Sequence, residues 1–398
     1  MFESVQLAPV DPILGLTEAF KADTNPEKIN LGVGVYQDES GVTPVLPSVV
    51  EATRRVTSAE KTKSYLPIPG DPAYGKVAQK LLFGEGHEVI ASGRAATSHT
   101  PGGTGALRVT GDFLKQNLPS ATLWLTDPTW ANHPAIFDAA GVPTKKFPYF
   151  DPKTNGLAFD EALAAIKQIP AGDAILLHGC CHNPSGIDPT AEQWQEIAAV
   201  LKQNGVLPII DFAYQGFGEG IEEDSAGLRM FCEPGAELIV CGSFSKNFGL
   251  YRERVGAVTF VGQDADRCAT VQSQVKRCIR TLYSNPPAHG AALVTAILSD
   301  AELTTQWQGE LAEMRDRING MRKLLVSKLA EHGADADYSF IEGQNGMFSF
   351  SGLSKDQVAK LREVHSIYIV GSGRINVAGV SPSNIDRLCQ AIVAVTQA

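Results

Sequence analysis

Leu238-Ile-Val-Cys-Gly-Ser-Phe-Ser-Lys246-Asn-Phe-Gly-Leu-Tyr-Arg-Glu-Arg254 is the most informative stretch of the chain. Its opening run, up to the cysteine, is continuously apolar, which is typical of a strand that is buried on both faces of a sheet. Small and hydroxylated residues follow, and Lys246 comes directly after them. Open α/β sheets bind ligands at the carboxyl ends of their strands, so this pattern predicts that Lys246 faces a ligand. A lysine at such a position loses hydration, which lowers its pKa and frees the amine to attack a carbonyl.

A lysine taken at random is usually a solvated surface residue, so the rest of the chain has to support this prediction. Further apolar stretches predict strands at Ala121–Thr126, Asp173–His178, Val206–Ile210 and Val255–Phe260. Helical patterns lie between them, and the clearest runs from Thr190, which forms a capping box with Gln193, to Asn204. This alternation predicts an α/β fold in which helices cover both faces of a mostly parallel sheet.

The pattern changes near residue 300. Ser299 and Asp300 predict the start of a long helix that ends near Glu331. The elements expected beyond it are strands at Met347–Phe350, Ile367–Val370 and Arg374–Val377, a helix that opens at Ser354, and a final helix. Because 398 residues exceed one ordinary core, we expect a large α/β domain and a smaller α+β domain. The first residues have no structural partner of their own and are predicted to form an extended N-terminal arm.

The composition argues against several classes of function. The net charge of −10 argues against nucleic-acid binding, and no apolar stretch is long enough to span a bilayer. The first residues lack the basic and apolar segments of a secretory signal. The seven cysteines are scattered, and only Cys180 and Cys181 are close in sequence. Their spacing fits neither a metal site nor a redox motif, so we expect reduced thiols, no metal and a cytoplasmic protein.

Other segments at predicted strand ends carry groups that bind ligands. Thr100–Arg108 is rich in glycine and leads into a helix, as phosphate-binding segments do, although a tight turn before a helix explains the same pattern. Trp130 follows a strand and is able to stack on a flat ring, although a core tryptophan is the commoner case. Asn183 can donate to a ligand oxygen, although Asn-Pro also marks an ordinary turn.

Charged groups occur in comparable positions. Asp211 ends a predicted strand, where it can stay ionised against a protonated ring nitrogen, and Tyr214 follows three residues later. The alternative role of such an aspartate is to cap a helix. Arg254, Arg280 and Arg374 are suited to bind phosphate or carboxylate groups bidentately, although each alone is more typical of a surface residue.

Taken in order, these segments resemble the class I aminotransferases, which are pyridoxal-phosphate enzymes of fold type I, and within them the aspartate and aromatic aminotransferase branch. The resemblance begins at Asp11-Pro-Ile-Leu and covers nearly the whole chain. Its most specific segments are Ser-Phe-Ser-Lys246-Asn-Phe-Gly-Leu-Tyr, Cys-Cys-His-Asn183-Pro-Ser-Gly, Tyr-Ser-Asn285-Pro-Pro-Ala-His-Gly and Ser-Gly-Arg374-Ile-Asn-Val-Ala-Gly. The resemblance implies a large domain with a mostly parallel seven-stranded sheet at residues 44–312. It also implies a small domain built from residues 12–43 and 313–398, and an arm at residues 1–11.

The resemblance implies a role for each residue around the cofactor. Lys246 would hold pyridoxal 5'-phosphate as a Schiff base and later carry the α-proton of the substrate. The groups around the ring would be Trp130 by stacking and, by hydrogen bonding, Asp211, Tyr214 and Asn183, with His133 behind Asp211. The groups around the phosphate would be Gly103, Thr104, Ser243 and Arg254, with Tyr65 supplied by a second subunit.

The resemblance also implies how the substrate is held. Arg374, with Asn183 and the backbone at Gly34, would bind the α-carboxylate. Arg280 of a second subunit would bind the side-chain carboxylate of a dicarboxylic substrate, so a homodimer with shared active sites is expected. The implied reaction is ping-pong transfer of the amino group of L-aspartate to 2-oxoglutarate.

Three alternatives remain open. An aromatic-amino-acid aminotransferase keeps both arginines, although Arg280 together with Asn285 is more similar to the aspartate branch. A non-catalytic homologue that only binds the cofactor would not need every residue with a chemical role, and all of them are present. A Schiff-base decarboxylase or lyase gains nothing from two arginines that hold carboxylates tightly.

Overall fold

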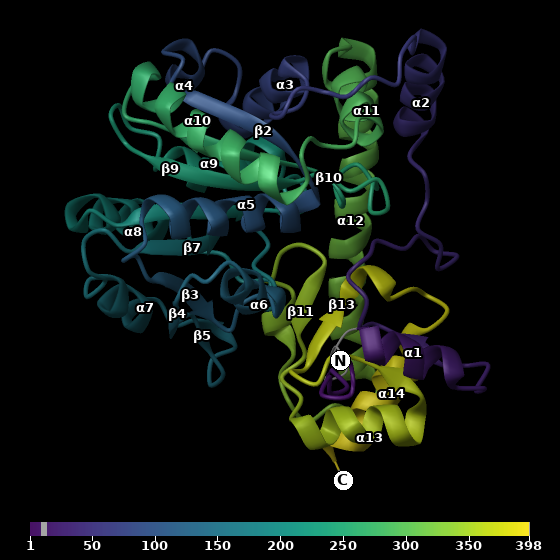
Figure 1. The fold of residues 1–398 in the computed structure, drawn as a ribbon. Helices are drawn as coiled ribbons and strands as arrows, with labels where there is room; N and C mark the ends of the chain where they lie inside the picture. Colours follow the sequence, from purple (N-terminus) through teal and green to yellow (C-terminus); the bar gives the residue numbers. More distant parts are fainter. Residues whose placement is uncertain (9–13, 398) are drawn as a thin grey trace.

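The computed structural model describes residues 1–8 and 14–397, and seven strands form its central sheet (Figure 1). From edge to edge the strands are β2 (Ala95–Pro101), β10 (Val255–Val261), β9 (Leu238–Ser243), β8 (Leu207–Phe212), β7 (Ala174–His178), β3 (Leu123–Asp127) and β4 (Thr144–Pro148). β10 runs antiparallel to β2 and β9, and every other neighbouring pair is parallel. The predicted fold class is confirmed, and the five predicted strands are found within about two residues of their expected bounds.

The sheet is buried on both faces because alternate residues of its strands point to opposite sides. In β9, Leu238 and Val240 belong to one core and Ile239 and Cys241 to the other. The helices that contribute to the Ile239 side are α5 (Gly102–Asn117), α6 (Asn132–Ala139) and α10 (Ala265–Leu282). Those that contribute to the Leu238 side include α3 (Pro72–Phe83), α7 (Phe159–Ile166), α8 (Ala191–Asn204), α9 (Ile221–Arg229) and α11 (His289–Leu298). This two-sided burial explains the continuously apolar strands of the sequence.

The helix ends follow the predicted signals. The predicted capping box at Thr190 opens α8, and Gly205 ends it in the left-handed conformation, with a φ of 66°. Asp300 caps α12 (Ala301–Glu331), and a second capping box at Ser354 opens α13 (Lys355–His365). The remaining helices are α1 (Leu14–Ala22), α2 (Pro47–Ala59), α4 (Glu88–Ala91), α14 (Ile385–Thr396) and the short η1 (Ser339–Ile341) and η2 (Val377–Gly379).

A second group of elements lies beside the C-terminal half of α12, away from the large sheet (Figure 1). It contains α1, α13, α14 and two small sheets, which pair β1 (Ile29–Asn30) with β12 (Ile367–Tyr368) and β11 (Phe348–Phe350) with β13 (Arg374–Asn376). The strands expected near residues 347, 367 and 374 are thus found. A further hairpin, β5 (Phe150–Asp151) with β6 (Gly156–Leu157), follows the edge strand β4. The exact domain boundaries stay a prediction.

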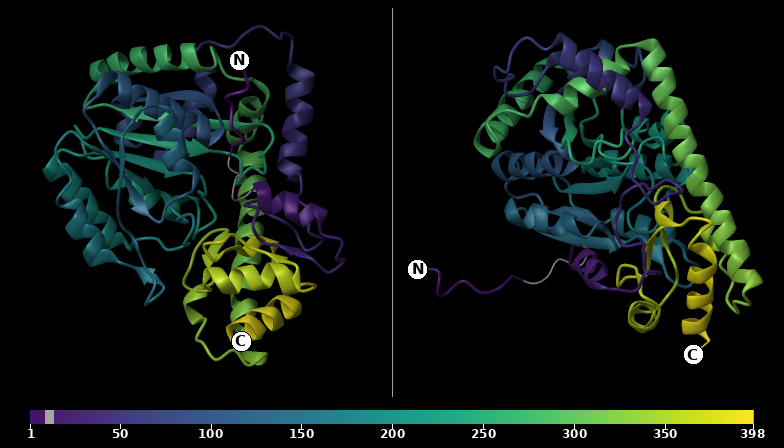
Figure 2. Two further views of the ribbon diagram at one scale, coloured as in Figure 1. Left: turned by 60° about the horizontal axis from the view of Figure 1, so that its bottom comes forward. Right: turned by 90° about the vertical axis from the view of Figure 1, so that its right-hand side faces the viewer.

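The start of the chain stands apart from the rest. Residues 1–8 are exposed and extend away from the other elements (Figure 2). Residues 9–11 of the predicted arm, and most of the Asp11-Pro-Ile-Leu segment, lie outside the described residues. Within the described part of the chain, no helix has both the length and the apolar character needed to span a membrane.

Candidate active site

A cavity of about 270 Å³ opens where β7, β8 and β9 end. Its wall includes these predicted site residues: Gly34, Gly103, Thr104, Trp130, Asn183, Asp211, Tyr214, Ser243, Lys246, Arg254 and Arg374. The wall also includes six residues that were not predicted, namely Leu107, His178, Ala213, Ser245, Tyr251 and Phe348. The carboxyl ends of the parallel strands therefore gather the polar groups of distant sequence segments around one space, as such sheets usually do.

Lys246 lies in the turn after β9 and is partly buried at the cavity wall. Its Nζ lies 4.7 Å from the centroid of the Tyr214 ring. Burial lowers the pKa of Lys246 to about 8, and the nearby carboxylate of Asp211 only partly offsets that effect. A substantial fraction of this amine is therefore neutral near physiological pH, so it can act as a nucleophile or a base.

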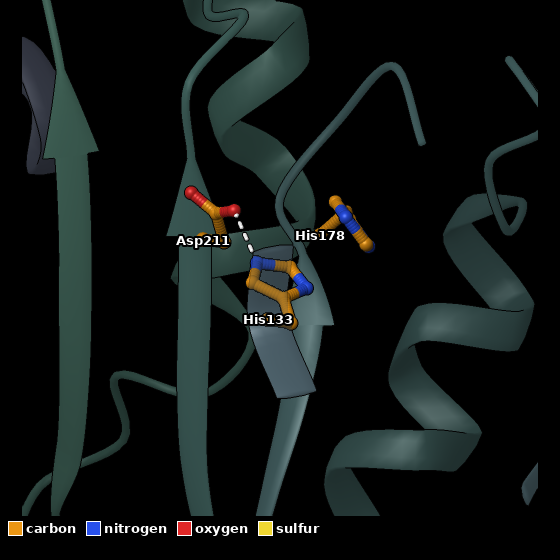
Figure 3. Close-up of side chains that lie close together, drawn as sticks. All are labelled: His133, His178 and Asp211. Carbon is orange, nitrogen blue, oxygen red and sulfur yellow. Dashed lines mark hydrogen bonds and ion pairs between the residues drawn. The ribbon is translucent and has the colours of Figure 1, made fainter. Parts of the chain in front are cut away.

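Asp211 faces the cavity from the end of β8, and two histidines lie behind and beside it (Figure 3). His133 Nε2 lies 2.9 Å from Asp211 Oδ2, and Thr129 Oγ1 lies 2.7 Å from His133 Nδ1. Burial alone would raise the pKa of Asp211, but the hydrogen bond with His133 and the charge of Lys246 hold it below its usual value. Asp211 therefore stays ionised although it is buried. The structure thus places His133 within hydrogen-bonding distance of Asp211.

His178 is a cavity residue that the sequence did not single out. Its ring centroid lies 5.2 Å from that of His133 and 4.4 Å from that of His182. Burial lowers the pKa of His178 to about 3, so its ring is neutral. Its place at the end of a predicted strand was the available signal, but a strand-end histidine is not specific enough to indicate a site.

Buried or half-buried partners hold each of the three turns that carry the polar groups. The carboxylate of Asp188 accepts from the backbone N–H groups of Cys181 and His182, at 2.7 and 2.9 Å, before the Asn183 turn. Asp224 accepts from three backbone N–H groups in the turn after Tyr214, those of residues 216, 218 and 219. These carboxylates fix the turns because buried backbone donors need partners.

The turn of Lys246 is held from α12. The indole nitrogen of Trp307 donates to the carbonyl oxygen of Asn247 at 2.7 Å. The Trp307 ring also stacks on Phe248, with centroids 4.3 Å apart. The long helix thereby fixes the residues directly after Lys246.

One end of the cavity is suited to an anion. α5 begins there at Gly102, and a helix N-terminus offers free N–H groups and positive partial charge. Gly102 has a φ of 75°, and a Cβ atom on it would lie 2.4 Å from Arg254 Nη2. A Cβ on Gly103 would lie 3.0 Å from the Cβ of Ser243. The lack of side chains at these two glycines therefore lets Arg254 and Ser243 pack closely against the start of α5.

Arg374 also lines the cavity and is 4 % exposed. It donates to the carbonyl of Gly32 at 2.7 Å and to Asn183 Oδ1 at 3.3 Å. Its guanidinium carbon lies 4.2 Å from the centroid of the Phe348 ring. Its Nε has no partner among the described residues, and burial lowers its pKa. A buried guanidinium with spare donors is suited to bind a carboxylate.

The remaining two predicted residues lie outside this cavity wall. Tyr65 is 92 % exposed. Arg280, near the end of α10, is also exposed and donates to Ser284 Oγ. The structure of one chain thus does not bring them to the other predicted residues.

A sequence model of the family aminotransferase class I and II matches residues 26–392 of this chain. The chain therefore belongs to the aminotransferase class I and II family, as its motifs indicated.

The relatives are similar over their whole length. The aspartate aminotransferase of Salmonella typhi is 54 % identical, with 99 % of this chain and 100 % of the relative covered. That of Escherichia coli K12 is 53 % identical with the same coverage. A crystal structure of an aromatic-amino-acid aminotransferase from Burkholderia pseudomallei, covalently bound to pyridoxal phosphate, is 49 % identical, with 99 % of each chain covered and a TM-score of 0.97.

Proposed function

We propose that this chain is a pyridoxal-phosphate-dependent aminotransferase that transfers the amino group of L-aspartate to 2-oxoglutarate. The observation that carries the proposal is one cavity whose wall combines Lys246, of lowered pKa, the ionised Asp211, the buried Arg374 and the start of α5. The full-length similarity to proteins named aspartate aminotransferase supports the choice of substrate.

The residues present fit pyridoxal phosphate at both of its polar ends. The α5 N-terminus suits a phosphate, and the glycines there let Arg254 and Ser243 approach it closely. An ionised carboxylate such as Asp211 suits a protonated ring nitrogen. When bound, the cofactor supplies the electron sink for the substrate α-carbon and carries the amino group between the two substrates.

The chain's own residues then act on the substrate. Lys246 Nζ would take the proton from the substrate α-carbon and return it, since its pKa of about 8 keeps both protonation states available. Asp211 would stay ionised and keep the proton on the ring nitrogen. Burial raises the pKa of Tyr214, so its phenol remains a hydrogen-bond donor toward the ring oxygen. Trp130 and Asn183 would hold the ring in place from the cavity wall.

Two arginines would select the substrate. Arg374 would bind the α-carboxylate, with Asn183 and the backbone at Gly34 beside it. Arg280 would bind the distal carboxylate, and Tyr65 would reach the phosphate, both in the active site of a second subunit. Their exposure in a single chain supports a homodimer with shared sites, because neither side chain reaches its own chain's cavity wall.

An aromatic-amino-acid aminotransferase is the second candidate. Solved structures that carry this name share the fold closely, with 49 % identity in one case. Relative kcat/KM values for aspartate and phenylalanine distinguish the two, and a preference for phenylalanine would overturn our choice of substrate.

Two broader assignments accompany the proposal. We propose an arm at residues 1–11, a small domain of residues 12–43 and 313–398, and a large domain of residues 44–312. The grouping of β11, β13, α13 and α14 beside the end of α12 supports this division. We also propose that the protein acts in the cytoplasm, since all seven of its cysteines are buried and free.

An absorbance experiment tests the proposed function. The purified protein loaded with pyridoxal phosphate should show a visible band that moves to shorter wavelength with aspartate and returns with 2-oxoglutarate. The Lys246→Ala variant should lose at least about 10⁵-fold in kcat, as removal of a nucleophile and base usually does. Parental turnover by this variant would contradict the role of Lys246.

A further inference from the structure

Arg322 of α12 is a buried arginine behind the proposed substrate site. It is 1 % exposed. Its Nη2 donates to the carbonyl oxygens of Gly346 and Phe348, at 2.6 and 2.9 Å, and its Nη1 donates to Asn319 Oδ1 at 3.3 Å. Its Nε has no partner in the described part of the chain. Burying a guanidinium among neutral acceptors is costly, and this burial lowers the pKa of Arg322 to about 10.

The segment that Arg322 holds is fixed on its other side to the turn that carries Asn183. The backbone N–H of Asn345 donates to the carbonyl of Gly186 at 2.6 Å, and its side chain donates to Asp188 at 3.4 Å. Gly346 has a φ of 76°, and a Cβ on it would lie only 2.4 Å from the Cβ of Cys181. Residues 345–348 are therefore held between α12 and the Asn183 turn.

The ring of Phe348 transmits this position to the cavity. It lies 4.2 Å from the guanidinium of Arg374 and packs edge-on against Tyr214, with ring centroids 5.9 Å apart. On the Gly34 side, a Cβ atom would approach Phe348 Cζ to 2.7 Å, so the ring fills the space that the missing side chain leaves. A shift of the Phe348 backbone would therefore move the surface on which Arg374 rests.

We infer that Arg322 is a positioning residue for substrate carboxylate binding: it fixes the main chain of Phe348, whose ring holds Arg374 in place. The inference rests on the proposed function, in which Arg374 binds the α-carboxylate. It assigns Arg322 no contact with substrate or cofactor. Its loss should weaken the binding of substrates and dicarboxylate inhibitors while the cofactor stays bound.

Arg322→Met tests this, with Arg317→Met as the matched control. Arg317 lies on the same helix and donates to the carbonyls of Ala378 and Val380, at 3.2 and 3.0 Å, but not to Phe348. We expect Arg322→Met to raise the KM for aspartate and the Kd for succinate by about 10-fold or more, with kcat changed less than about 3-fold. The reason is that a small displacement of Arg374 weakens its contact with the substrate carboxylate. Arg317→Met should change both constants by less than about 2-fold. Equal effects of the two variants would overturn the inference.

Arg322→Lys and Phe348→Leu keep the test decisive if the methionine variant folds poorly. Lysine still donates to one or both carbonyls, so it should restore the succinate Kd to within about 3-fold of the parent. Phe348→Leu should weaken succinate binding, and adding Arg322→Met to it should cause little further loss, since both changes act on one contact. Additive losses would show that Arg322 does not act through Phe348. A parent protein that binds cofactor but has no aminotransferase activity would contradict the proposed function instead, whatever the variants do.

Discussion

Arg374 and Arg280 are both proposed to bind a substrate carboxylate, yet their surroundings in the chain are opposite. Arg374 is buried, bonded to Gly32 and Asn183, and packed on Phe348. Arg280 is exposed and bonded to Ser284, a neighbour on its own chain. One arginine is held in place before any ligand arrives, whereas the other lacks such support within one chain.

This difference indicates which half of the site a single chain completes. The elements around Lys246, Asp211 and Arg374 come from several distant segments, and each is held by buried partners. The distal carboxylate site depends on what covers Arg280. We therefore expect changes on the completed side to affect every substrate and changes at Arg280 to affect only dicarboxylic ones.

The largest expected effect is that of Arg374→Ala. It should lower kcat/KM by about 10³- to 10⁴-fold for both aspartate and phenylalanine, since both carry the α-carboxylate and a charged partner would be lost. Arg374→Lys should recover little, because a lysine cannot reproduce the bidentate contact. Steady-state kinetics with both substrates provide the measurement. A loss confined to aspartate would contradict the assignment of Arg374 to the α-carboxylate.

Arg280→Ala should produce a selective loss. We expect kcat/KM for aspartate to fall about 10²- to 10³-fold and that for phenylalanine to change less than about 10-fold, because only aspartate has a distal carboxylate. The cofactor should remain bound with unchanged absorbance. Equal losses for the two amino acids would contradict the assignment of Arg280.

Gly102→Ala tests whether this chain completes the phosphate end. The added methyl group would displace Arg254, so we expect the Kd for pyridoxal phosphate to rise about 10-fold or more. Gly41→Ala is the matched control, since Gly41 has a similar φ of 77° but open space around it. A titration of cofactor-free protein measures both. Similar Kd values for the two variants would contradict the role of the start of α5 in holding the phosphate.

The smallest expected effect concerns stability of the cofactor-free protein. The pKa of Lys246 is about 8 in the folded chain and 10.5 without perturbation, so the folded state disfavours its proton. This penalty is complete below pH 8 and disappears as the pH rises toward 10.5. Lys246→Met should therefore be more stable than the parent at pH 7, by on the order of 1 kcal/mol, and the difference should shrink at pH 10.

Urea unfolding at the two pH values measures the stability difference. Arg280→Met serves as the control, because Arg280 lies outside the cavity wall that Lys246 lines in the chain. A Lys246→Met difference that grows with pH would contradict the burial argument.

Continuous apolar runs and capping signals made much of the fold predictable. The strands β7 and β9 were predictable from their continuously apolar sequences, because both of their faces are buried. β4 was missed because Thr144-Lys-Lys146 is exposed at a sheet edge, and its pattern is that of a surface segment. β2 was missed because Ala95–Pro101 is built from small and polar residues.

Site residues were predictable where they belong to a specific sequence motif, and less predictable where only the folded structure brings them to the site. Ser245 and Tyr251 lie within the Lys246 motif, but their contribution to the cavity wall depends on how the turn folds back. Phe348 lies on a predicted strand, but only tertiary packing brings it against Arg374. Trp307, which fixes the turn after Lys246, bonds a residue 60 positions away, and local patterns do not reveal such a contact.

Subunit mixing tests most directly whether the two arginines serve different chains. Lys246→Ala and Arg280→Ala subunits, each nearly inactive with aspartate, would be unfolded together in equal amounts and refolded. If Arg280 serves its partner, each hybrid dimer contains one intact site, so the mixture should recover about one quarter of parental activity. Activity no higher than that of the two variants refolded separately would show that Arg280 serves its own chain, and would contradict the shared site.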